Sequence, residues 1–214
     1  MQEPNLSATV LAVAGLRQAG VDGDDPLFAE AARFISSCQN FRAGCDGVSR
    51  FDDGGFFQMA ADVSRNKAGV AGIDREGRRR FRSYFSATAD GVRGLLLCGV
   101  RPEDPRVAAG LRWMARNPAL DDVPDLLFYA GYARSRVAEL PGPAGARIDP
   151  GFQCGSERLV PLPQNRDGSY SNPAGEMREN EALVATSLAV MTCRRNSGNQ
   201  NQPQRSNQSV RRDG

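Results

Sequence analysis

The chain has 214 residues, of which 40% are hydrophobic and 24% are charged, and its formal net charge is +2. These values are typical of a soluble globular protein of one domain, or of part of a larger one. Five arginines and a single aspartate lie in the last 21 residues, so the rest of the chain is slightly acidic and lacks the basic surface of a nucleic-acid-binding protein.

Missing and scarce residue types exclude several kinds of site. The chain has no histidine, which excludes Ser-His-Asp and Cys-His catalysis and any zinc site that needs imidazole. The cysteines form no C-x-x-C pair and are odd in number, so we expect free thiols, no metal and no cofactor. They are Cys38, Cys45, Cys98, Cys154 and Cys193. Lys67 is the only lysine.

We expect no targeting or membrane-spanning segment in these 214 residues. No apolar run approaches the length of a membrane span. The apolar stretch at residues 6–16 has no basic residue before it, unlike a signal peptide. We therefore expect a cytoplasmic protein, and the sequence leaves membrane association open.

The first predicted unit is a helical hairpin at residues 7–38. Apolar residues recur at helical spacing over residues 7–19, and Gly20 supplies the left-handed residue that ends a helix. Asp25 is a candidate N-cap, and Pro26 occupies the first helical position, where a missing N–H costs nothing. The second helix is therefore expected over residues 26–38.

An insertion follows this hairpin. Residues 42–52 and 62–82 are rich in Gly, Asp and Arg, which indicates solvated loops. The run Arg78-Arg79-Arg80 leaves an anion site as the alternative interpretation.

A second hairpin repeats the first at an offset of 79 residues. Residues 7–38 and 86–117 share 12 identities in 32 positions without a gap. The stop glycine, the N-cap aspartate and the first-position proline recur as Gly99, Asp104 and Pro105. Helices are therefore expected over residues 86–98 and 105–117.

The C-terminal part continues the helical pattern and then loses it. Apolar residues on one face predict a helix over residues 124–140, and Ala185-Thr186 is similar to the two earlier helix starts. From residue 196 the composition is polar and predicts disorder, so the array ends within a hairpin. We assign residues 1–193 to one repeat domain and residues 194–214 to a disordered tail.

A junction motif, Gln followed by Asp-Gly-x-aromatic, occurs twice, once compact and once split by the insertion. Its glycine allows a tight turn, its ring covers apolar surface and its amide satisfies helix-end groups, so it is structural rather than catalytic. The motif residues are Gln39, Asp53, Gly54 and Phe56 in the split copy, and Gln164, Asp167, Gly168 and Tyr170 in the compact copy.

Three features together carry a resemblance over most of residues 5–190: the Ser-Ala-Thr helix start, the Gly-Val-x-x-x-Asp-Pro turn and the junction motif. In this order they resemble the prenyltransferase and squalene oxidase repeats of squalene–hopene cyclases. The resemblance implies an all-α fold, an α/α toroid of inner and outer helices around an apolar cavity. Pro161 and Pro163 interrupt one helix, and no Gln motif follows Arg116. We therefore expect an incomplete, truncated toroid of about seven or eight helices.

The family's acid motif, Asp-x-Asp-Asp before Thr-Ala, is missing from all three helix starts. Residues 22–25 have its letters but align with residues 101–104, a turn between helices. Residues 121–125 have the letters of a prenyl-diphosphate site, but Pro124 prevents the helix that such a site needs. Residues 153–157 lack the glutamine of a thioester motif.

The carboxylates that remain to be tested for an overlooked acid are Asp22, Asp24, Asp90 and Asp121.

The leading hypothesis is a squalene cyclase-like repeat protein that binds an apolar or isoprenoid-like ligand without cyclising polyenes. Phe128, Tyr129 and Tyr132 are candidates for the cavity wall, with ordinary core as the alternative. The alternative function is a helical-repeat scaffold that binds proteins, and a cyclase or lyase with unrecognised active residues is a third. An unfinished array also predicts an exposed apolar face and self-association.

Overall fold

The computed structural model describes residues 4–42, 50–117, 126–137, 139–140, 164–174 and 178–193. The described residues are mostly helical, as expected, and none of their helices is long and apolar enough to cross a bilayer. They form α1 (Leu6–Gln18), α2 (Pro26–Ser37), β1 (Val70–Ile73), β2 (Arg79–Phe81), α3 (Phe85–Leu97), α4 (Pro105–Arg116), α5 (Leu127–Val137) and α7 (Ala182–Cys193). The expected tail at residues 194–214 lies outside the described residues.

The α1–α2 hairpin begins and ends where its capping residues predict. Gly20 has φ 80°, and the Val21 N–H donates to the Leu16 carbonyl at 3.1 Å, which closes the end of α1. The Asp25 side chain accepts from the Leu27 N–H at 2.9 Å, and Pro26 follows at the first helical position.

The α3–α4 hairpin has the same caps. Gly99 has φ 84°, and the Val100 N–H donates to the Leu95 carbonyl at 3.0 Å. The Asp104 side chain accepts from the Arg106 N–H at 2.9 Å. Each predicted helix of the two hairpins therefore lies within one residue of its observed bounds.

The expected solvated loop at residues 62–82 contains an antiparallel hairpin, which corrects the expectation of an all-α chain. β1 pairs with β2 around a turn in which Gly77 has φ 75° and the Asp74 carboxylate accepts from the Arg78 N–H at 2.8 Å. Arg80 forms an ion pair with Asp52 at 2.8 Å. The run Arg78-Arg79-Arg80 is therefore partly neutralised, by Asp52 from the preceding segment and by Asp74, which pairs with Arg78 at 3.0 Å.

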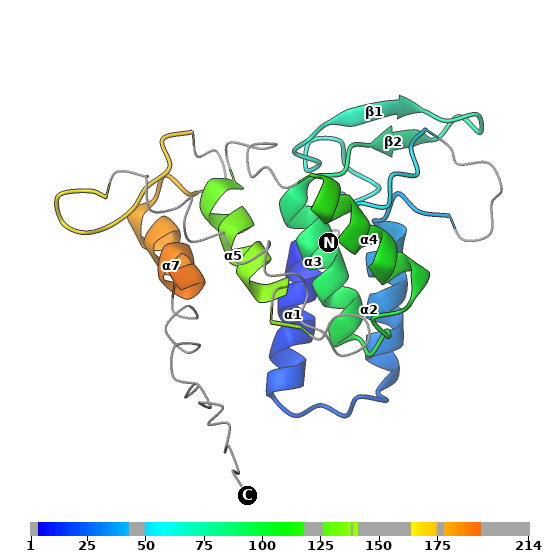
Figure 1. Ribbon diagram of the computed structural model, residues 1–214, viewed down its shortest axis with the longest axis horizontal. Coiled ribbons are helices and arrows are strands. Elements are labelled where there is room, and N and C mark those ends of the chain that lie inside the picture. Colours follow the sequence, from blue (N-terminus) through cyan, green and yellow to red (C-terminus); the bar gives the residue numbers. More distant parts are fainter. Residues whose placement is uncertain are drawn as a thin grey trace, which may run out of the picture.

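Helix α3 lies at the centre of the helices, and α1, α2, α4 and α5 all pack against it (Figure 1). All of its residues from Phe85 to Val92 are buried. Gly91 lies against the ring of Phe56, where a Cβ atom would overlap the ring. The small residues of α3 therefore let the junction between α2 and α3 pack closely.

Helices α5 and α7 lie on one side of α3, where α5 packs on α3 and α7 packs on α5 (Figure 1). Their shared cluster contains Phe128, Ala185 and Ala189. The start of α5 is capped from a distant segment, because Glu179 accepts from the N–H groups of Phe128 at 3.0 Å and Tyr129 at 2.7 Å.

The predicted and observed helix boundaries differ for α5 and α7. Helix α5 occupies Leu127–Val137 within the expected residues 124–140. Helix α7 begins at Ala182, three residues before the predicted start at Ala185.

Candidate functional site

A pocket of about 450 Å³ opens where the beginnings of α1, α3, α5 and α7 come together. The segment between Phe57 and Gly69 completes its wall. The lining residues are Asn5, Ser7, Gln58, Arg65, Lys67, Tyr84, Ser86, Leu126, Tyr129, Glu179, Val184 and Leu188. The pocket therefore draws on helix starts that are far apart in the sequence.

One wall of the pocket is a polar network anchored on Asp90. The Ser7 hydroxyl and the Tyr129 hydroxyl each donate to Asp90 Oδ2 at 2.8 Å. Tyr84 donates to Gln58 Oε1 at 3.1 Å. Gln58 Nε2 donates to the Asn5 side chain at 3.0 Å. Hydroxyl and amide groups from α1, α3, α5 and the intervening segment thus face one another.

Asp90 is only 1% exposed, and its carboxyl group lies behind the hydroxyls of Ser7 and Tyr129. Burial raises the pKa of this carboxyl, although the hydrogen bonds from Ser7 and Tyr129 and the charge of Arg93 oppose the shift. Burial likewise raises the pKa values of Tyr84 and Tyr129, and the charge of Asp90 adds to the shift. Both phenols are therefore neutral hydrogen-bonding groups.

The opposite wall is apolar and comes from α5 and α7. Leu126, Val184 and Leu188 provide its aliphatic surface. Glu179 also lines the pocket, but its carboxylate accepts from two N–H groups of α5 and from Asn172 Nδ2 at 3.0 Å. Burial raises the pKa of Glu179 and these hydrogen bonds oppose the shift. The charge of Glu179 is thus committed to holding α5.

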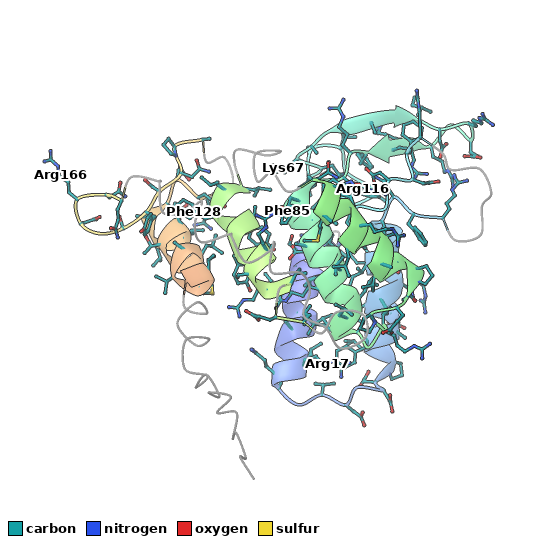
Figure 2. The ribbon with its side chains drawn as sticks, viewed as in Figure 1. Arg17, Lys67, Phe85, Arg116, Phe128 and Arg166 are labelled. Atoms are coloured by element: carbon teal, nitrogen blue, oxygen red, sulfur yellow. The ribbon has the colours of Figure 1, made fainter. Side chains whose placement is uncertain are left out.

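Two basic side chains, Arg65 and Lys67, lie on the pocket wall. Arg65 forms an ion pair with Asp62 at 3.4 Å. Lys67 lines the pocket together with Tyr84 and Ser86 at the start of α3, and Figure 2 labels it at that end of the helix. The pocket therefore combines a cationic part, a hydroxyl-rich part and an apolar wall.

Phe128, Tyr129 and Tyr132, the three residues predicted to line a cavity, lie in different surroundings. Tyr129 lines the pocket. Phe128 is fully buried and packs edge-on against Tyr170, with ring centroids 5.9 Å apart. Tyr132 is 7% exposed, and its ring lies 6.0 Å from that of Tyr129. Only Tyr129 is among the described residues that line the 450 Å³ pocket.

The split junction motif is held by a compact set of hydrogen bonds. Gln39 Nε2 donates to the Gly54 carbonyl at 2.9 Å, and Gly54 has φ 89°. The Asp53 carboxylate accepts from the Gly55 N–H at 2.9 Å. The Phe56 N–H donates to Thr88 Oγ1 at 3.0 Å, which ties the motif to α3.

The compact motif makes the corresponding bonds. Gln164 Nε2 donates to the Gly168 carbonyl at 2.6 Å, and Gly168 has φ 85°. The Asp167 carboxylate accepts from the Ser169 N–H at 3.0 Å. The Tyr170 N–H donates to Thr186 Oγ1 at 2.8 Å, which ties this copy to α7. These residues lie at helix junctions and do not line the pocket.

The acid-motif look-alike at residues 22–25 forms the turn between α1 and α2. Asp22 Oδ1 accepts from the Asp24 N–H at 3.1 Å, and Asp25 caps α2. The sequences at residues 121–125 and 153–157 lie outside the described residues. Among the described residues, no group of three Cys, Asp or Glu side chains is placed to hold a metal ion.

A second pocket of about 490 Å³ lies between the β-hairpin and the end of α4, and it includes Trp113 and Asn117. Three of its polar side chains, those of Asn40, Asp53 and Ser83, are already engaged by the fold, and it has less apolar lining than the first pocket. Asn40 Nδ2 donates to the Phe81 carbonyl at 2.8 Å, and Ser83 donates to Asp53 at 2.7 Å. The first pocket is therefore the stronger candidate.

Most of the pocket was not predicted from the sequence. Tyr129 was predicted as a wall candidate and Asp90 as a carboxylate to test, whereas Ser7, Gln58 and Glu179 were not. A carboxylate at Asp90, within the small and apolar run that begins α3, was the one available signal. The others are joined only by tertiary contacts.

Comparison of the chain with protein-family models, curated proteins and solved structures found no match in any of the three. The resemblance to squalene cyclases therefore rests on the motifs of this chain alone.

Proposed function

We propose that this chain is a partial α/α toroid of helical-hairpin repeats, similar to squalene cyclases, and that it binds an apolar or isoprenoid-like small molecule. The shared caps of the two hairpins and the shared hydrogen bonds of the two junctions support the repeat. The observation that carries the function is the 450 Å³ pocket between four helix starts. Its volume lies within the range of about 300–1,000 Å³ that small-molecule sites occupy.

The walls favour a ligand with an apolar body. Leu126, Val184 and Leu188 exclude water from one side, and burial of apolar ligand surface there is favourable by about 25 cal/mol per Å². The hydroxyl oxygens of Ser7 and Tyr129 line the other side and can accept hydrogen bonds, since their protons are donated to Asp90. The pocket therefore suits an amphipathic molecule better than a pure hydrocarbon.

Binding without polyene cyclisation fits the chemistry of Asp90. Protonation of an alkene needs a strong acid that touches the double bond. Burial raises the pKa of Asp90, which makes it a weaker acid, and Ser7 and Tyr129 separate it from the pocket. We expect purified protein incubated with squalene to give no cyclic triterpene by mass spectrometry, whereas turnover that Asp90→Asn abolishes would overturn this part of the proposal.

Displacement of a neutral fluorescent probe tests the binding function. Nile red bound to the full chain should be displaced by farnesol. Val184→Trp fills the pocket and should weaken binding of both molecules by about tenfold or more, because it overlaps the apolar wall. Leu183→Trp is the matched control, since Leu183 directly precedes Val184 on α7, is 81% exposed and does not line the pocket.

The two variants separate the possible results. Weakened binding in Val184→Trp alone supports the pocket. Unchanged binding in Val184→Trp, or a loss confined to Leu183→Trp, would contradict it.

A protein-binding scaffold is the second candidate function. Leu183 is 81% exposed and Val190 is 46% exposed, and residues seven apart lie on one face of a helix. This apolar face of α7 favours association with another protein surface. A loss of partner binding in Leu183→Glu, with farnesol binding intact, would support this function instead.

A further inference from the structure

Within the described part of the chain, Lys67 is a cation without a partner, and it lines a pocket of small-molecule size. It is partly buried, and it makes no ion pair or hydrogen bond within the part of the chain that the structure describes. It is also the only lysine of the chain, among 26 arginines that account for the remaining basic residues. The cation therefore has spare capacity for three hydrogen bonds to an anion.

Glu179 shares the pocket, but among the described residues it forms no ion pair with Lys67. It accepts hydrogen bonds from the Phe128 and Tyr129 N–H groups and from Asn172, so both of its oxygens already have donors. Arg65 lies on the same wall and pairs with Asp62 at 3.4 Å. Within the described lining, Lys67 is therefore the cation left to pair with an anion.

The apolar wall limits what kind of anion fits. A free inorganic anion would pair with Lys67 but would leave the surface of Leu126, Val184 and Leu188 in water. An anion attached to an apolar chain satisfies both parts at once, since it forms a charge-assisted hydrogen bond and buries hydrocarbon.

We propose that the ligand of this pocket is an amphiphile with an anionic head, a phosphate or a carboxylate, which pairs with Lys67 while its apolar chain lies against α5 and α7. This inference rests on the proposed function and specifies the ligand's head group. Arg65, near the same wall, increases the local concentration of anions, so the preference for an anionic head weakens as salt screens the charges.

Matched probes test the head group. Farnesyl phosphate, farnesol and inorganic phosphate are each titrated into the full chain, with displacement of Nile red and calorimetry as readouts. Farnesyl phosphate should bind about tenfold or more tightly than farnesol, because a charge-assisted hydrogen bond in a partly buried site has that effect. Lys67→Met should remove the difference and leave farnesol binding unchanged.

Two further variants control for charge and for position. Lys67→Arg keeps the cation and should retain most of the preference for farnesyl phosphate. Arg82→Met removes a cation from the second pocket and should have no effect. Equal loss in Arg82→Met and Lys67→Met would mean that overall charge, not Lys67, sets the preference, and would overturn the inference.

The single lysine also permits a direct footprint. Brief acetylation followed by mass spectrometry reports one lysine side chain, with acetylation of the N-terminal amine as an internal reference. Farnesyl phosphate should protect Lys67 at least several-fold, and farnesol or inorganic phosphate at the same concentration should not. Equal protection by inorganic phosphate would establish a free-anion site and overturn the amphiphile.

The remaining outcomes separate the two proposals. If farnesol and farnesyl phosphate bind equally and Lys67→Met changes neither, the head-group inference fails and the proposed function stands. If neither compound binds, both fail.

Discussion

Asp90 shows how one buried carboxyl links stability to pH. In an unfolded chain an aspartate has a pKa of about 3.9, and burial raises that of folded Asp90. The folded state therefore holds the proton over a pH range in which the unfolded state has lost it. The stabilisation is fully present below the unfolded pKa and is lost as the pH rises through the folded pKa.

We predict that the free energy of unfolding falls with pH, from about pH 4 upward, more steeply in the wild type than in Asp90→Asn. The amide does not titrate, so the difference between the two proteins isolates Asp90 from Glu179, whose pKa is raised in the same direction. Urea unfolding across this pH range measures it. Asp22→Asn, on the exposed turn, corrects for the loss of one carboxylate, and a pH-independent difference would contradict the prediction.

Two glycines at matching repeat positions have opposite surroundings. A Cβ atom at Gly15 would meet nothing within 4 Å, whereas one at Gly94 would lie 2.7 Å from Val10 Cγ2 and 2.8 Å from Ile35 Cδ1. Gly15→Ala should stabilise the protein by about 0.5–1 kcal/mol, because alanine favours the helix. Gly94→Ala should destabilise it by about 1–3 kcal/mol through overpacking. Thermal melts of both variants check the pair, and a shift of the same sign in both would count against the packing around α3.

At the scale of elements, the junctions between helices carry much of the structure. Each junction uses a glutamine side chain and a glycine of positive φ, and each joins its aromatic residue to a threonine of the next helix. The two copies differ in burial. Phe56 is fully buried at the centre of the molecule, and Tyr170 is partly buried at its outer part.

Phe56→Ala should therefore destabilise the protein by about 3–5 kcal/mol, as expected for an aromatic ring lost from a core. Tyr170→Ala should cost less, about 1–2 kcal/mol, since its ring keeps part of its surface in water and contacts chiefly Phe128. The two motifs share a glutamine, an aspartate, a glycine and an aromatic residue, so this order follows from the difference in their burial. Denaturant unfolding of the two variants measures it, and a larger loss in Tyr170→Ala would contradict the order.

At the scale of the whole molecule, the outer helix α7 leaves apolar surface exposed. It packs on α5 through Ala185 and Ala189, while Leu183 and Val190 face outward. Surfaces of this kind favour association in water.

We predict that the chain self-associates and that Leu183→Glu shifts it toward monomers, because a charge in a contact costs desolvation. Light scattering over a range of concentrations measures the change. Leu11→Glu is the control, since Leu11 is 48% exposed on α1, away from α7. The same shift in both variants would assign the association to general hydrophobicity instead of to the face of α7.

The sequence by itself determined where the first four helices begin and end. Stop glycines, capping aspartates and first-position prolines act on their own neighbours, so the bounds of α1 to α4 followed from them within one residue. The β-hairpin was missed because its strands are short, because β2 contains two arginines in three residues, and because its turn depends on Asp74 and Gly77 together. The start of α5 depends on Glu179, some 50 positions away in the chain.

Only the tertiary structure decided the pocket. It joins Ser7, Gln58, Asp90 and Tyr129, which are up to 122 positions apart in the chain. It separates Tyr129 from Phe128, its neighbour in sequence, because successive helical residues point about 100° apart. It also decided that Gly15 is exposed while Gly94 is enclosed, since α3 is surrounded by other helices and α1 lies at the edge. The matching capping residues of the two hairpins specify helices of matching length, whereas the helices packed around each one determine which of its faces is buried.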